Sequence, residues 1–132
     1  MMKKLAYFFI MFSILVFSAC EYEIIDSKPG EPLDPVSNLN YSISGSEVTL
    51  TWDLPTSYPD DIIQPVSVFI RIIINGVNAG TQTLEGAPES YTFTGYDPQD
   101  TYKFIVKVRG EVDTDNPNLS DLRYSLGSTI EF

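Results

Sequence analysis

Residues 66–76 read VSVFIRIIING, and this stretch decides the fold. Its apolar side chains fall on both parities, with Val66, Val68, Ile70, Ile72 and Ile74 on one side and Phe69 and Ile73 on the other. A short run that is apolar on both faces is typical of a strand in the middle of a sheet. The Asn75-Gly76 dipeptide that follows suits a type I′ turn, because both central residues of that turn need positive φ. The stretch therefore predicts a hairpin whose second strand runs to about Leu84.

Period-two alternation continues on both sides of this hairpin and predicts further strands. Upstream, Leu39, Tyr41 and Ile43 precede a turn at residues 44–46, and Val48, Leu50 and Trp52 follow it. Downstream, the apolar markers are Tyr91 and Phe93, then Tyr102, Phe104, Val106 and Val108, and finally Tyr124, Leu126 and Ile130. No convincing helical stripe follows residue 20. Seven short strands in about 100 residues predict an all-β, seven-stranded antiparallel sandwich.

Three stretches of this pattern resemble the fibronectin type III module. Residues 35–39 read PVSNL, residues 48–55 read VTLTWDLP, and residues 96–106 read YDPQDTYKFIV. In the family's pattern Leu-x-Pro-x-Thr-x-Tyr, Tyr102 takes the place of the tyrosine corner, whereas Tyr96 and Asp100 replace the Leu and the Thr. The resemblance covers residues 35–132 and implies a core position for Trp52. The two replacements leave open a different immunoglobulin-like sandwich.

The N-terminus has the layout of an export signal. Residues 1–20 read MMKKLAYFFIMFSILVFSAC, in which two lysines precede an apolar run from residue 5 to residue 17. The segment Phe17-Ser18-Ala19-Cys20 resembles the bacterial lipobox, with Phe17 where that motif usually has Leu. The resemblance implies that residues 1–19 are a lipoprotein signal peptide and that Cys20 becomes a lipidated mature N-terminus carrying acyl chains such as palmitate. The alternatives are an ordinary cleaved signal and an uncleaved anchor, although the run is shorter than the about 20 residues that a membrane-spanning helix needs.

Residues 20–34 have the composition of a spacer, and we expect the sandwich to occupy residues 35–132. Pro29, Gly30 and Pro32 interrupt any regular pattern, and such a segment is extended, with a reach of about 45 Å. The acids Glu21, Glu23 and Asp26 resemble the surface-export tag of lipoproteins in some Gram-negative bacteria. We therefore expect an outer membrane lipoprotein, on the cell surface or on the periplasmic face.

Charge and composition exclude several classes of partner. The chain has 132 residues with a formal net charge of -10, and both lysines of the leader are lost if residues 1–19 are removed. A chain this acidic repels nucleic acid, so attachment to the membrane must come from the lipid. The chain has no His and a single Cys, which excludes an internal disulfide, a cysteine-based zinc site and the commonest general base. We expect no cofactor and no metal.

One face of the predicted sandwich combines cations with apolar side chains. The cations on the outward parity of the third, sixth and seventh strands are Arg71, Lys103, Lys107, Arg109 and Arg123, and the apolar residues beside them are Phe69, Ile73 and Ile105. In the fibronectin-like arrangement these three strands are neighbours in one sheet. The face is a candidate docking surface for an acidic protein or a glycan. The alternative is that the Lys and Arg stems only cover the apolar side chains.

Other candidate sites in the sequence are weaker. The loop from Asp113 to Asp121 is rich in oxygen ligands, but an EF-hand counted from Asp113 fails at its fifth and sixth positions, and a solvated turn or a calcium site of another kind remains. Asp60 and Asp61 are adjacent, so on extended chain they point in opposite directions and do not form a catalytic pair. Tyr58 is the ring that we expect to be exposed. We expect no catalytic residues.

These observations favour a non-catalytic cell-envelope lipoprotein that acts as a binding or assembly module for a protein or glycan partner. One alternative is a structural subunit of a surface appendage, which requires an exposed edge strand that pairs with another chain. A second is an accessory glycan-capture lipoprotein, which requires exposed aromatic rings. An enzyme is the third class, and no spacing of residues in the chain favours it.

Overall fold

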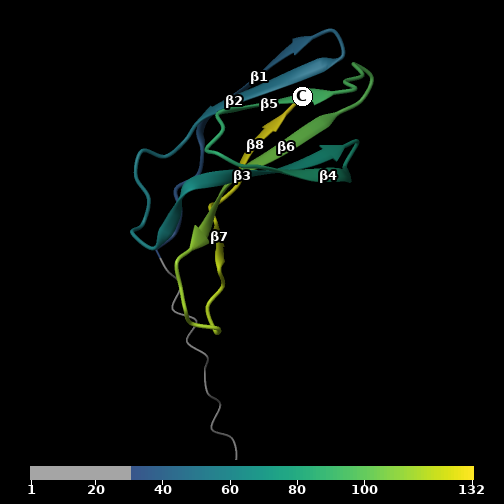
Figure 1. Cartoon of the computed structure of the whole chain (residues 1–132). Coiled ribbons are helices and arrows are strands. Elements are labelled where there is room, and N and C mark those ends of the chain that lie inside the picture. The colour runs from purple at the N-terminus through teal and green to yellow at the C-terminus, as the bar shows by residue number, and fades with distance from the viewer. Residues whose placement is uncertain (1–30) are drawn as a thin grey trace, which may run out of the picture.

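The computed structural model describes residues 31–132 (Figure 1). The predictions on the leader, on Cys20 and on most of the spacer therefore lie outside the described residues. The strands are β1 (Ser37–Ser44), β2 (Glu47–Asp53), β3 (Ile62–Ile74), β4 (Val77–Leu84), β5 (Ser90–Thr94), β6 (Tyr102–Val112), β7 (Leu122–Tyr124) and β8 (Ser128–Glu131). From residue 31 onward, no helix has the length and apolar character needed to cross a membrane.

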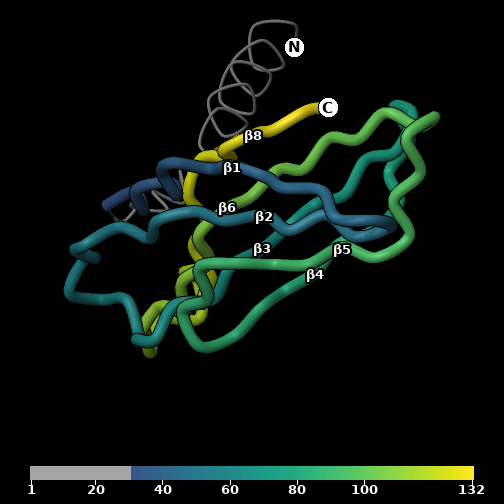
Figure 2. The backbone as a smooth tube through the Cα atoms, turned by 90° about the horizontal axis from the view of Figure 1, so that it is seen from above, coloured from purple at the N-terminus to yellow at the C-terminus, as the bar shows by residue number. Residues whose placement is uncertain are grey.

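The strands form two antiparallel sheets that pack face to face (Figures 1 and 2). The smaller sheet has the order β1-β2-β5, and the larger has the order β4-β3-β6-β7, with β8 also paired to β6. The predicted all-β antiparallel sandwich is confirmed. The third, sixth and C-terminal strands are neighbours in one sheet, as the fibronectin type III resemblance implies.

The core lies between the two sheets and follows the alternation seen in the sequence along β2, β3 and β6, whereas Tyr41 and Ile43 of β1 are exposed. Along β6, every second residue from Tyr102 to Gly110 is buried, and the residues between them are half-buried. The ring of Trp52 is 3% exposed, and its Nε1 donates a hydrogen bond to the Pro88 carbonyl at 2.9 Å. Each fully buried Val, Leu, Ile or Phe contributes about 1.5–3 kcal/mol, so this alternation is the main source of stability.

Two local signals in the sequence are confirmed in the turns. Asn75 and Gly76 have φ values of 52° and 77°, which is the backbone conformation that a type I′ turn needs. Tyr102 is 2% exposed, and its hydroxyl accepts a hydrogen bond from the Asp97 amide at 2.9 Å. A Tyr at the start of this strand that bonds back to the preceding corner is the arrangement that the family pattern predicts.

The number of strands differs from the prediction, because the expected seventh strand is divided into β7 and β8. Arg109 lies opposite Tyr124 and Val106 lies opposite Ser128, so three residues between the strands face two on β6, which is a β-bulge. Ser125 holds the bulge: its amide donates to the Val108 carbonyl at 2.9 Å, and its Oγ accepts from the Val108 amide at 2.9 Å.

The bulge reverses which side chains point inward. Tyr124 and Leu126, which the alternation places inward, are 44% and 80% exposed. Ile130, beyond the bulge, packs against the core as expected. An extra residue shifts the two-residue period by one, so the parity of the strand before the bulge cannot be read from the strand after it.

The packed part of the chain begins before residue 35. Leu33 is 3% exposed and belongs to the core. Its Cδ1 lies so near β6 that a Cβ added at Gly110 would be 3.2 Å away. Leu33, which the composition assigns to the spacer, is thus part of the folded domain.

Candidate docking face

The outer face of β3 and β6 carries alternating apolar and cationic side chains. In the register of the two strands, Phe69 lies opposite Lys107, Arg71 opposite Ile105, and Ile73 opposite Lys103. Residues opposite each other in an antiparallel pair share a face, so each apolar side chain has a cation as its partner across the strands. We call this surface the cationic face; it consists of Phe69, Arg71, Ile73, Lys103, Ile105, Lys107 and Arg109.

Two cations of the face have carboxylate partners. Lys103 Nζ lies 2.7 Å from Glu131 Oε1 on β8. Arg109 Nη1 lies 3.6 Å from Glu85 Oε1 and donates a hydrogen bond to Ser67 Oγ at 3.0 Å. These contacts hold the two side chains at opposite ends of the face and partly neutralise them.

Arg71 and Lys107 occupy the middle of the face and, among residues 31–132, form no ion pair. Arg71 is exposed and Lys107 is half-buried. The stem of Lys107 also passes near Gly127, where an added Cβ would lie 3.4 Å from the Lys107 Cε. The Lys107 stem therefore lies beside the chain at Gly127, and the positive charges of Arg71 and Lys107 remain without a carboxylate partner among residues 31–132.

Arg123, which the parity of the predicted strand places on this face, lies elsewhere. It is opposite Gly110 on the inner side of the sheet, because the bulge reverses the parity. Its Nη1 and Nη2 donate to Asp61 Oδ1 at 2.9 Å and to Oδ2 at 2.7 Å, and Nη1 also donates to the Glu31 carbonyl at 3.1 Å. The hydrogen bonds from Arg123 lower the pKa of Asp61, and the same bonds raise the pKa of Arg123. Arg123 therefore connects β7 to Glu31 and Asp61, and we call these contacts the Arg123 clip. It is not part of the cationic face.

Tyr124 takes a place on the face that sequence reasoning missed. It lies opposite Arg109, and its ring meets the ring of Phe69 edge to face at a centroid distance of 5.7 Å. The one residue in the sequence that could have indicated the bulge, and with it the outward position of Tyr124, is Gly127. It has no side chain, and this leaves room for Ile105 next to the bulge. This edge-to-face geometry is one that aromatic pairs favour, and Tyr is enriched at protein interfaces.

A shallow pocket of about 440 Å³ lies at the end of the cationic face, and its lining includes Ile73, Lys103, Glu131 and Phe132. Tyr58, Asp61, Tyr91 and Arg123, the groups whose pKa values shift, lie outside the pocket. The pocket therefore combines an ion pair with apolar surface.

The remaining candidates from the sequence do not form a site in residues 31–132. In the loop after β6, side-chain oxygens of the loop accept hydrogen bonds from its own backbone amides: the Asn116 amide donates to Thr114 Oγ1 and the Asn118 amide to Asn116 Oδ1. This bonding is typical of a turn, and no cluster of metal-ligating side chains is found in the described chain. Asp61 bonds to Arg123, so it does not act as one of a carboxylate pair with Asp60.

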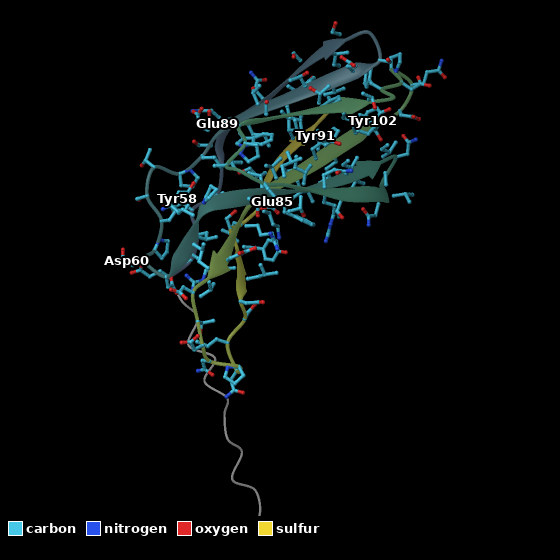
Figure 3. The ribbon with its side chains drawn as sticks, viewed as in Figure 1. Tyr58, Asp60, Glu85, Glu89, Tyr91 and Tyr102 are labelled. Atoms are coloured by element: carbon cyan, nitrogen blue, oxygen red, sulfur yellow. The ribbon has the colours of Figure 1, made fainter. Side chains whose placement is uncertain are left out.

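Tyr58 is not the exposed ring that the sequence predicts. It lies on the connection between β2 and β3, on the same side of the molecule as Glu89 (Figure 3), and packs partly against the core. Burial raises its pKa, and the Glu89 carboxylate raises it further. The exposed aromatic rings of the described chain are Tyr41 and Tyr124.

The comparisons with known proteins concern the fold and the family. The model of one family, described as Domain of unknown function (DUF4945), matches residues 20–132. No curated protein matches the chain. A solved structure from the computer-based redesign of a β-sandwich protein is 18% identical, with a TM-score of 0.52, and the match covers 76% of this chain and 88% of that chain. The crystal structure of an FN3 domain of human collagen XX is 16% identical, with a TM-score of 0.46 and coverages of 76% and 96%.

Proposed function

The chain belongs to the DUF4945 family, and we propose that it is a non-catalytic, lipid-anchored envelope protein that binds an acidic partner through the cationic face. The observation that supports this function is the pair of cations, Arg71 and Lys107, that have no carboxylate partner among residues 31–132. They lie between apolar side chains on a rigid sheet. Interfaces that combine Arg with apolar and aromatic anchors are typical of protein recognition.

The proposed partner is an envelope protein or a glycan with carboxylates spaced along an extended surface. An acidic molecule gains from both free cations, and its apolar parts gain from Phe69 and Tyr124. The two exposed rings among residues 31–132, Tyr41 and Tyr124, also favour the glycan-capture alternative, because sugar rings stack on aromatic faces. The role requires no cofactor.

The proposed anchor is Cys20, with the protein held at the outer membrane on the cell surface or the periplasmic face. The family model begins at residue 20, which is the residue at which the lipobox resemblance places the mature N-terminus. Several acyl chains, at about 0.8 kcal/mol for each buried methylene, give stable anchoring. The domain is then free to meet partners beyond the lipid headgroups.

Crosslinking on whole cells tests the docking face. Lys107→Glu is expected to lower the yield of crosslinked partner at least about tenfold, equivalent to about 1.4 kcal/mol, because it opposes an acidic partner at the centre of the face. The control is Thr51→Glu with Thr92→Glu, which changes the net charge by the same amount on the outer face of the smaller sheet. A crosslinked partner whose yield falls equally in both variants, or in neither, contradicts the proposal.

One further observation favours the structural-subunit alternative. β4 is the last strand of its sheet, and Val77–Leu84 contains no charged residue and no Pro. Edges of this kind are templates for pairing with another chain, and a Lys on the edge blocks such pairing. If β4 pairs with another subunit, Gln82→Lys abolishes the assembly that native gels detect, whereas Lys107→Glu leaves it intact.

A further inference from the structure

The side chain of Asn75 fastens the turn between β3 and β4 to the corner that precedes β6. Its Nδ2 donates a hydrogen bond to Asp100 Oδ1 at 2.8 Å. Its Oδ1 accepts one from the Thr101 amide at 2.9 Å and a longer one from Thr101 Oγ1 at 3.3 Å. The Asn75 amide donates to the Thr101 carbonyl at 2.9 Å. We call these four contacts the Asn75 clamp.

The residue after the clamp makes the Asn75 side chain chemically labile. Asn75 and Gly76 are both exposed, and the Gly76 amide forms no backbone hydrogen bond within the described chain. Gly has no Cβ to hinder a close approach to its backbone nitrogen. Asn is a thermolabile residue, because a backbone nitrogen that reaches its Cγ displaces the side-chain nitrogen. An exposed Asn-Gly pair is therefore the sequence in which this reaction meets the least steric hindrance.

We propose that Asn75 is a site of spontaneous deamidation, that the Asn75 clamp slows the reaction, and that the completed reaction opens the clamp. In the first step a bond forms between the Gly76 nitrogen and Asn75 Cγ, and the bond from Cγ to Nδ2 breaks. Nδ2 leaves as ammonia and takes the proton of the Gly76 amide. Water then hydrolyses the five-membered succinimide at one of its two carbonyl groups, which leaves aspartate or isoaspartate at position 75. Water is the only other reactant.

The clamp slows the first step because it holds both polar atoms of the Asn75 carboxamide. Cγ approaches the Gly76 nitrogen only after the side chain has turned away from Asp100 and Thr101, so these hydrogen bonds have to break first. The bond from Nδ2 to Asp100 has an ionised acceptor, and bonds of this kind are stronger than those between neutral groups. Asp100 is therefore the residue with the largest expected effect on the rate.

The products of the reaction do not fit the clamp. An aspartate at position 75 has an oxygen in place of Nδ2, so it meets the Asp100 carboxylate with a like charge and without a proton to donate. An isoaspartate adds a methylene group to the backbone, which a two-residue turn does not accommodate in the same register. Gly76 and Thr101 line the pocket at the end of the cationic face, so opening the clamp alters one side of that pocket.

Mass spectrometry of the proteolytic peptide that contains residue 75 tests the effect of the clamp on the rate. The purified protein is incubated at mildly alkaline pH, and the replacement of the side-chain amide by a carboxyl group is followed over time. Asp100→Ala is expected to raise the rate at Asn75 at least about tenfold, which corresponds to about 1.4 kcal/mol in the barrier. Asp100→Asn keeps an oxygen acceptor and is expected to lie closer to wild type than to Asp100→Ala.

Two controls accompany this measurement. Asp115→Ala makes the same change in net charge in the loop between β6 and β7, and its rate at Asn75 is expected to equal that of wild type. Asn118, which precedes Leu119, is the internal reference in every digest. Equal rates at Asn75 in Asp100→Ala and Asp115→Ala overturn the proposal, and so does a rate at Asn75 in Asp100→Ala that is no higher than the rate at Asn118. Circular dichroism verifies that each variant folds.

Asn75→Asp reproduces one of the two products and tests the opening of the clamp. Hydrogen exchange of the Thr101 amide, followed by NMR, is expected to become at least about tenfold faster. The control is Asn78→Asp on β4, which makes the same change in charge and keeps the Oδ1 that accepts from the Gly80 amide. Exchange at Thr101 that is equal in the two variants overturns the opening.

This reaction goes beyond the proposed function, because it requires neither a partner nor a lipid. The substitutions that test it lie outside the cationic face, and its readouts are a mass and an amide exchange rate. Crosslinking on cells therefore succeeds or fails independently of the rate at Asn75.

Discussion

The hydroxyl of Tyr102 connects the start of β6 to the corner that precedes it. The ring is buried, and the hydroxyl accepts the hydrogen of the Asp97 amide. Without the Tyr102 hydroxyl, the Asp97 amide would need a water molecule as its hydrogen-bond acceptor at a partly buried corner. The contact therefore holds the connection between β5 and β6 in place, next to the pocket at the end of the cationic face.

Tyr102→Phe removes this hydrogen bond and keeps the ring. We expect a loss of about 1–3 kcal/mol in the free energy of unfolding, because a donor in a part-buried site loses its partner. Urea denaturation followed by Trp52 fluorescence measures it. Tyr124→Phe is the control, since the exposed Tyr124 hydroxyl makes no hydrogen bond within residues 31–132, and its effect is expected to be close to zero. Equal effects of the two substitutions contradict the role of the corner.

The ion pair between Asp61 and Arg123 makes stability depend on pH in the acid range. Hydrogen bonding to Arg123 lowers the pKa of Asp61 below its ordinary value of 3.8. The stabilisation is thus complete above about pH 4 and is lost as the pH falls through the lower pKa of the folded state. Asp61→Asn is expected to be less stable than wild type at pH 7, with a difference that shrinks at about pH 2–3.

Unfolding curves at both pH values, for the variant and for wild type, measure this effect. Asp60→Asn is the matched control, because the Asp60 carboxylate makes no ion pair in the described chain. A stability difference for Asp61→Asn that stays constant down to pH 2 would show that protonation of the Asp61 carboxylate does not change the free energy of unfolding.

Among the elements, the bulge between β7 and β8 has the largest effect on the candidate site. It sends Arg123 to the inner side and Tyr124 to the cationic face. It also brings Gly127 against β6, where an added Cβ would lie 2.6 Å from Ile105 Cγ2. A side chain at position 127 has to displace Ile105 or the strand.

Gly127→Ala is therefore expected to destabilise the domain by about 1–3 kcal/mol, the usual cost of overpacking. In the background of Ile105→Ala, which removes the clashing Cγ2, the same substitution is expected to cost much less. Thermal unfolding of the four proteins gives the interaction free energy. Additive effects would mean that Gly127 is required for another reason.

The sequence predicts those elements that depend on neighbouring residues. The prediction fails where a contact with a residue far along the chain determines the structure. Asn75-Gly76 specifies its own turn, and the apolar run of β3 specifies its burial, because each depends on neighbouring residues. The bulge depends on Ser125 bonding to Val108, which is 17 residues away, and no local pattern marks it. The cationic face was predicted from residues such as Arg71, Lys107 and Arg109. The bulge explains why the position of Arg123 was predicted wrongly and that of Tyr124 was missed. The partial burial of Tyr58 depends on packing against the core, which no local pattern in the sequence indicates.

At the scale of the whole molecule, the proposed role depends on attachment through Cys20. Cys20→Ala is expected to abolish incorporation of radiolabelled palmitate and to release the protein from the membrane fraction, since no other thiol is present. Cell fractionation with labelling measures both. The control is Ser18→Ala, which keeps a small residue before the Cys. Label retained in the Cys20 variant would place the lipid on another group, and an unlabelled variant that stays in the membrane fraction would show that the anchor is not a lipid.

The clip at Arg123 also determines how the domain carries mechanical load. If a bound partner pulls on the cationic face while the membrane holds the N-terminus, tension enters the sandwich at Glu31 and Leu33, before it reaches β1. The guanidinium that grips the Glu31 carbonyl also grips Asp61 with two bonds, and Leu33 is seated beneath Gly110. The force is thus spread over β7 and the end of β3, and β1 is shielded from being peeled off its sheet.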